Sequence, residues 1–161
     1  MREAIGGTWL FGLVITFIVF FASFLAISVN YSKAFNVKNN IVDMISKYEG
    51  NNCNARNKIG NYLSDVGYLV TGDCGSIDGD NYDAYAYDLK GNKLASGKKG
   101  YYCIAKTDTG SDTDIKKTYY RVIVFFKVDL PVIGNITTFK IKGETESIYY
   151  ANDESNKSSC S

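Results

Sequence analysis

Four cysteines are the residues of this chain whose chemistry is easiest to assign. Cys53, Cys74, Cys103 and Cys160 all follow a long apolar run near the N-terminus, and their number is even. They include no C-x-x-C pair and the chain has no histidine, so their spacing fits no zinc site. Two disulfides formed in an oxidising compartment are therefore predicted, and all three possible pairings remain open.

Two acidic stretches, DGDNYD and TDTGSDTD, offer oxygen ligands that a calcium ion could use. Their ligand candidates are Asp78, Asp80, Asn81 and Asp83 in the first and Asp108, Asp112 and Asp114 in the second. An EF-hand loop needs glycine at its sixth position and glutamate at its twelfth. In a loop that begins at Asp78, these two positions are occupied by Asp83 and Leu89. We therefore expect solvated turns in both places, and neither a metal nor any other cofactor.

Charge and motif content exclude two further classes of protein. Of the 18 Lys/Arg and 17 Asp/Glu residues, only Arg2 and Glu3 precede the apolar run, so the remainder of the chain is close to neutral. A nucleic-acid-binding face is expected to be distinctly basic, so nucleic acid is not an expected partner. Without histidine, a G-x-S-x-G motif or a phosphate loop, the sequence also predicts no enzyme.

The apolar run itself could be a cleaved signal peptide, a retained anchor or the stem of a filament subunit. No charged residue occurs in Ala4–Val29, which is 26 residues long. As a helix this run is about 39 Å long, whereas a bilayer core needs about 30 Å and a signal h-region has about 7–15 residues. The sequence therefore predicts a transmembrane stem at residues 1–30 and an extracytoplasmic domain at residues 31–161.

The orientation of this stem follows from the cysteines rather than from the flanking charges. Arg2 precedes the apolar run, while Lys33 and Lys38 follow it closely, so the positive-inside rule favours neither orientation. Disulfides require an oxidising compartment, which places the domain outside and the N-terminus in the cytoplasm. The expected location is a bacterial cell membrane crossed once.

Helical periodicity continues beyond the stem, and residues 31–67 are predicted to be helical. Apolar residues recur at three- to four-residue intervals, and these are Ala34, Val37, Ile41, Ile45 and Tyr48. Gly50 supplies a stop signal. A second, shorter helix is expected up to Gly67, with one apolar side formed by Ala55, Ile59, Tyr62, Leu63 and Val66.

From Tyr82 onward the period changes to two, which predicts an antiparallel sheet over residues 82–150. Alternating stretches at 82–89, 101–107, 118–128 and 136–150 suggest about four strands with one apolar face, covered by the amphipathic half of the long helix. Helices followed by a meander make an α+β fold. A polar tail at 151–161 is expected to be held in place by Cys160.

Two stretches of this chain resemble the TadE-like pseudopilins of tight-adherence (Flp-type) pilus systems, within the type IV pilin-like proteins. They are the start, MREAIGGTWLFGLVITFIVFF, and the closing strands, YYRVIVFFKVDLPVIGNITTFKIKGETESIY. The resemblance implies a pilus-assembly component, with a possible processing site at Gly6, Gly7 and Thr8. Cleavage after Gly7 would put Gly12 where pilins usually carry a glutamate, which favours an uncleaved or minor component over a bulk pilin.

The resemblance also suggests partners, namely the lipid bilayer, other pilin or pseudopilin subunits and the inner-membrane assembly platform, in a hetero-oligomer. Small residues at Gly12, Ala22 and Ala26 are candidate positions for close packing between stems. The alternative function is a signal-anchored domain that binds a ligand or cell-wall component and joins no pilus. Tyrosine pairs such as Tyr149-Tyr150 would suit adhesion or ordinary packing on a sheet.

Overall fold

This computed structural model describes residues 2–75, 84–109, 117–130 and 134–160 of the chain. Two helices are followed by an antiparallel sheet, so the predicted α+β class is confirmed. The elements in chain order are α1 (Arg2–Lys47), α2 (Cys53–Asp65), β1 (Ala84–Tyr87), β2 (Tyr102–Thr109), β3 (Lys117–Leu130), β4 (Gly134–Glu144) and β5 (Ile148–Tyr149). The sheet order is β1-β2-β3-β4, and β5 also pairs with β3.

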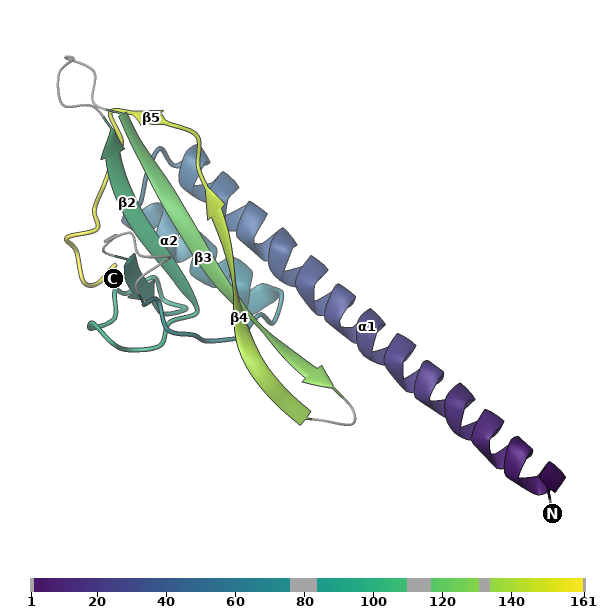
Figure 1. Cartoon of the computed structure of the whole chain (residues 1–161). Helices are drawn as coiled ribbons and strands as arrows, with labels where there is room; N and C mark the ends of the chain where they lie inside the picture. The colour runs from purple at the N-terminus through teal and green to yellow at the C-terminus, as the bar shows by residue number, and fades with distance from the viewer. Residues whose placement is uncertain (1, 76–83, 110–116, 131–133, 161) are drawn as a thin grey trace.

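A single helix, α1, forms both the stem and the cover of the sheet. Its 46 residues correspond to a length of about 69 Å. The N-terminal half projects away from the rest of the molecule, and the C-terminal half lies along the sheet (Figure 1). Because the chain's one proline lies outside this helix, no proline interrupts it between stem and domain.

The amphipathic half of α1 packs as the periodicity predicts. Ala34, Ile41 and Ile45 are fully buried, and Val37 is 2% exposed. They contact the alternate residues of β3 that face the helix, with Val122 and Val124 at the centre of the cluster. Burying each of the larger aliphatic side chains contributes about 1.5–3 kcal/mol, so this interface stabilises the packing of α1 on the sheet.

Both faces of the sheet are covered, which differs from the expected single apolar face. On the face away from α1, Ile123 and Phe125 of β3 are fully buried and pack with Cys74, Ala86 and Cys103. The cover there is the segment after α2 that contains Gly72 and Cys74. Gly72 exchanges two hydrogen bonds of 2.9 Å with Gly100, and a side chain at Gly72 would collide with the ring of Phe125. A closely apposed loop thus replaces a second helix.

The last predicted strand, 136–150, is interrupted. It forms β4, which pairs with residues 121–130 of β3, and the short β5, which pairs with Lys117 and Thr118. Between the two, the hydroxyl of Thr145 accepts a hydrogen bond of 2.9 Å from the backbone N–H of Tyr120. A side chain therefore substitutes for one backbone acceptor where the strand is interrupted.

Candidate functional site: the apolar stem and the domain it carries

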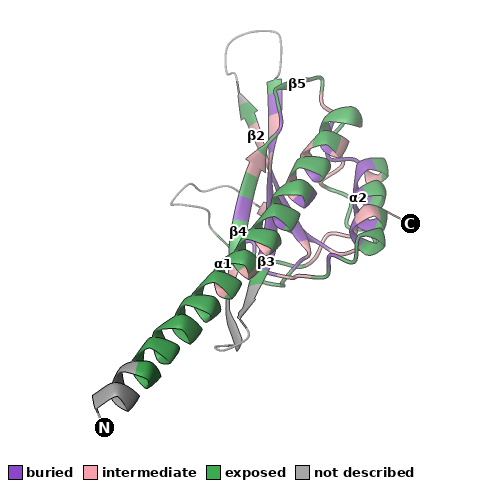
Figure 2. Ribbon diagram, turned by 90° about the vertical axis from the view of Figure 1, so that its right-hand side faces the viewer, coloured by how far each residue is buried: buried purple, intermediate pink, exposed green. Residues whose placement is uncertain are grey.

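Exposed apolar side chains surround the stem part of α1. Trp9, Phe11 and Phe20 are 72%, 65% and 68% exposed, and no residue in the most apolar 18-residue window of the helix is buried. Within the described chain, α1 is the one helix long and apolar enough to cross a membrane, a property that permanent anchors share with signal sequences. Figure 2 shows the contrast between this exposed stem and the buried inner face of the sheet.

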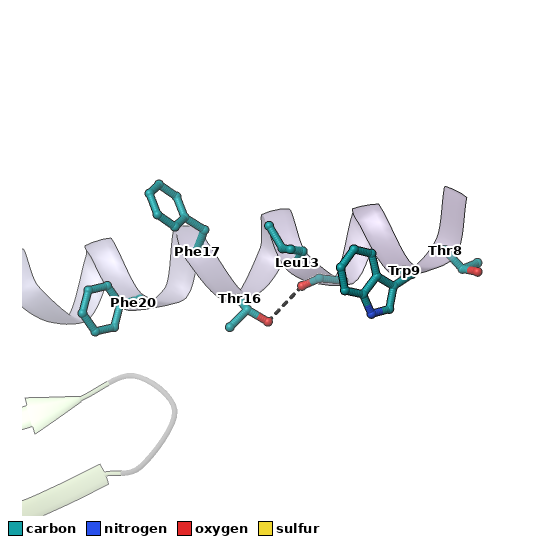
Figure 3. Close-up of a pocket in the computed structure, with 7 residues that line it drawn as sticks. Thr8, Trp9, Leu13, Thr16, Phe17 and Phe20 are labelled. Carbon is teal, nitrogen blue, oxygen red and sulfur yellow. Dashed lines mark hydrogen bonds between the residues drawn. The ribbon is translucent and has the colours of Figure 1, made fainter. Parts of the chain in front are cut away.

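A shallow hollow lies on the stem near its N-terminal end. It is lined by Thr8, Trp9, Gly12, Leu13, Thr16, Phe17 and Phe20. The hydroxyl of Thr16 donates a hydrogen bond of 2.9 Å to the carbonyl of Gly12, which satisfies it within the helix (Figure 3). A Cβ atom at Gly12 would meet nothing within 4 Å, so this glycine leaves open surface on the stem.

The other predicted stem residues lie on the same helix. Gly6, Gly7 and Thr8 belong to the first turns of α1. Ala22 is exposed and Ala26 is half-buried. At about 100° per residue, Gly12, Ala22 and Ala26 fall within an arc of about 80°. They share one side of the stem, and both the packing and the processing stay predictions.

The structure selects one of the three possible cysteine pairings. Cys53 is bonded to Cys160, with Cα atoms 5.2 Å apart and a sequence separation of 107 positions. Cys74 is bonded to Cys103, with Cα atoms 5.8 Å apart. The first disulfide fixes the polar tail to the start of α2, and the second fixes the covering loop to β2. Both segments lack regular secondary structure, and each is held by its disulfide together with hydrogen bonds to the rest of the domain.

Arg56 is a buried residue whose role the sequence analysis missed. Its side chain is fully buried, and its guanidinium donates to the carbonyls of Lys157 at 3.0 Å and Glu154 at 2.9 Å. It also lies 5.4 Å from the ring centroid of Tyr87. Arg56 precedes the buried Ile59 by three positions, so helical spacing does place it on the inner side of α2.

Position 66 shows the opposite error. Val66 was expected on the apolar side of α2, but it follows the helix end at Asp65 and is 37% exposed. Ala55, Ile59 and Leu63 are fully buried as predicted. The apolar side of α2 therefore ends about one turn earlier than its sequence pattern, and Arg56, next to Ala55, widens the buried side near the start of the helix.

Replacing Arg56 by alanine is expected to lower the free energy of unfolding by about 3 kcal/mol, because two carbonyls lose charge-assisted hydrogen bonds and a cavity forms. Arg56→Lys should recover less than half, since an ammonium cannot reproduce the planar fork. Urea unfolding of the full chain in non-ionic detergent, followed by circular dichroism, measures both. The matched control is the exposed Lys58→Ala on the same helix, expected to change stability by less than about 0.5 kcal/mol. Equal losses at both positions would contradict this role.

Four tyrosines contribute to the core. Tyr87, Tyr102 and Tyr120 are fully buried and Tyr68 is 4% exposed. Burial raises the pKa of Tyr68 to about 12 and raises the pKa values of the other three above their usual value. The amide of Asn51 donates a hydrogen bond of 2.9 Å to the hydroxyl of Tyr87.

The tyrosine pairs considered for adhesion divide between core and surface. Tyr102 and Tyr120 belong to the core, whereas Tyr149 and Tyr150 are 53% and 78% exposed. The exposed pair lies in and just after β5, at the end of the sheet away from the stem (Figure 1). Tyr149 and Tyr150 are therefore a pair in which both rings are exposed.

No family model, curated protein or solved structure matches the chain. The function is accordingly inferred from the residues and their geometry.

The predicted acidic stretches are only partly visible. Asp78, Asp80, Asn81 and Asp83 lie outside the described residues, as do Asp112 and Asp114. Asp108 accepts a hydrogen bond of 2.7 Å from the hydroxyl of Thr118, and its carboxylate lies 3.5 Å from the ammonium of Lys106. Among the residues that are described, no three His, Cys, Asp or Glu side chains are grouped as a metal site.

Proposed function

We propose that this protein is a membrane-anchored pseudopilin or minor pilin-like component of a tight-adherence, type IV-like pilus system. The stem crosses a bacterial cell membrane once, with the N-terminus in the cytoplasm and the disulfide-bonded domain outside. The protein acts through subunit packing and partner contacts.

The observation that carries this proposal is the continuity of α1. Its first half is apolar and exposed, while Ala34, Val37, Ile41 and Ile45 in its second half are buried under the sheet. One helix thus serves as anchor and as domain core, which is the layout that the resemblance to TadE-like chains implies. A simple signal anchor does not need its helix to form part of the domain core, because a flexible linker could join the anchor to the domain.

The domain's location outside the cytoplasm is supported by its two disulfides. Structural disulfides persist in oxidising compartments, and both bonds here fix segments that have no regular secondary structure. The charge-free stem favours retention in lipid through the loss of water around its apolar side chains. Association with neighbouring stems then depends on shape, since the run Ala4–Val29 offers no charge for an ion pair.

The proposal predicts that the stem lies beside other pilin-like stems in the native membrane. Phe17 is 60% exposed and lines the hollow near Gly12, so replacing it with photoreactive benzoylphenylalanine places the probe at the proposed contact. Irradiation of native cells should give adducts with other single-pass, pilin-like subunits, identified by mass spectrometry. The matched control carries the probe at Phe11, also exposed on the stem but not lining the hollow, and should give fewer protein adducts.

The same sample separates this proposal from the alternative. Adducts with lipid alone at both positions would favour a signal-anchored binding domain that joins no pilus. Intact mass of the purified protein supplies the second readout, since a start at Gly7 or Thr8 indicates processing and strengthens the pilin assignment. Loss of the entire apolar run would contradict both functions.

A further inference from the structure

Four aromatic residues form a row where the stem meets the domain. Tyr31 and Phe35 lie on α1, Phe126 on β3 and Phe139 on β4, and we call them the aromatic belt. Ring centroids are 6.3 Å apart between Tyr31 and Phe35, 6.0 Å between Tyr31 and Phe126, and 5.2 Å between Phe126 and Phe139. The belt therefore crosses three elements, running sideways from the stem.

The belt keeps much of its surface uncovered. Tyr31, Phe35 and Phe139 are 51%, 41% and 44% exposed, whereas Phe126 is only 9% exposed. Three large aromatic side chains open to solvent in one row are unusual on a soluble surface and mark a place where something else lies. The row also continues directly from the exposed apolar side chains of the stem.

The level of the belt matches the end of the apolar run. Tyr31 follows Val29, the last residue of the charge-free stretch, by two positions. Aromatic side chains are enriched at the boundary between lipid and water, where their rings lie among the headgroups. The belt thus lies where a membrane that holds the stem would have its outer surface.

Two strands continue past the belt toward the membrane. β3 runs on from Phe126 to Leu130, and β4 begins at Gly134, five residues before Phe139. Four strand residues span about 13 Å, equivalent to about nine residues of α1. Figure 1 shows these strand ends extending in the direction of the stem. The run Ala4–Val29 exceeds a bilayer core by about 9 Å, so about two thirds of the roughly 13 Å of strand lies outside the core, at the level of the headgroups.

Charge near the belt suits a lipid surface. Residues 125–142 contain three lysines and one aspartate, and Lys127 and Lys140 are exposed. On α1, the ammonium of Lys38 lies 4.1 Å from the ring centroid of Phe35, which leaves its charge next to the belt. Cations beside aromatic rings are the pattern expected for contact with anionic headgroups.

We propose that the aromatic belt and the adjoining ends of β3 and β4 form a second membrane contact, seated in the headgroup layer of the bilayer that holds the stem. This inference rests on the proposed membrane anchor. With α1 and the belt both in contact with lipid, the domain has a fixed tilt and a fixed rotation about the stem.

The test measures how strongly brominated lipid quenches the fluorescence of a single tryptophan in each variant. The full chain carries Trp9→Phe to remove its one tryptophan, and Phe139→Trp places an indole in the belt. The protein is reconstituted into phosphatidylcholine and phosphatidylglycerol vesicles, with or without bromine on the acyl chains near the headgroup. The matched control is Tyr149→Trp in the same background, at an exposed position on the far end of the sheet.

We expect bromolipid to quench the indole of the Phe139→Trp variant and to leave that of Tyr149→Trp unchanged. The belt contact would be overturned if the Phe139→Trp variant floats with the vesicles but its indole is not quenched. Quenching of Trp9 in a parallel sample of the wild-type protein would then show that the anchor is intact. Emission shifted to shorter wavelength without quenching would mean that a second copy covers the belt, which also overturns the lipid assignment. Failure to float with the vesicles would overturn both proposals.

Discussion

Replacing both Cys53 and Cys160 by serine is expected to lower the free energy of unfolding by about 4 kcal/mol. This disulfide joins residues separated by 107 positions, so it removes far more freedom from the unfolded chain than a short loop would. Serine suits both positions because neither cysteine is fully buried. The core under α1 contains neither residue and should keep its fold.

Urea unfolding of the full chain in non-ionic detergent measures this loss, and trypsin reports where the structure loosens. Lys157 lies in the tail that the disulfide holds, and its carbonyl accepts from Arg56. Cleavage after Lys157 should become faster in the double variant, while cleavage after the exposed Lys58 serves as the internal control. Reduction of the wild-type protein opens both disulfides and should lower the free energy of unfolding at least as much. An unchanged unfolding midpoint would show that packing alone fixes the tail.

Raising the pH from 10 to 12 is expected to unfold the domain, because the free energy of unfolding should fall with a slope approaching about 5 kcal/mol per pH unit. Burial raises the pKa values of Tyr68, Tyr87, Tyr102 and Tyr120 in the folded state. The folded state therefore holds these protons more tightly than the unfolded chain. Their contribution is fully present below pH 10, the ordinary pKa of tyrosine, and is lost as the pH rises toward the folded values.

Urea midpoints measured at successive pH values give this slope, and rapid return to pH 8 confirms that the transition is reversible. Tyr102→Phe is the sharpest variant, because the buried hydroxyl of Tyr102 has no hydrogen-bond partner in the described structure. Its loss should leave stability at pH 7 unchanged or raised by about 1 kcal/mol, and should reduce the alkaline slope by about one quarter. Tyr149→Phe, at an exposed site, should leave the slope as it is. A slope independent of Tyr102 would contradict the assignment.

Local periodicity was sufficient to predict the helices and the main interface. Ala34, Val37, Ile41 and Ile45 repeat at helical intervals, and the helix ends near the expected Gly50. The face of β3 that meets α1 also follows from alternation. Both patterns depend on residues close in sequence, so they can be recognised without knowing the fold.

The end of α2 before Val66 is a local feature that periodicity missed, but three other missed features depend on partners far apart in sequence. Phe125 is buried on the outer face because Gly72 comes close to its ring, and no local pattern connects these positions. Arg56 is buried because carbonyls about a hundred residues away accept its hydrogen bonds. Thr145 interrupts the last strand by bonding to Tyr120. In each case a distant polar or close-packed contact determines the conformation.

The continuity of α1 has a mechanical consequence. β3 runs alongside α1, so tension applied along the stem loads the interface between helix and sheet in shear, with many contacts resisting together (Figure 1). A hinge between stem and domain would let the domain swivel before any load reached the core. Here the unbroken helix acts as a rigid shaft, so each degree of rotation of the stem about its axis turns the domain by the same angle.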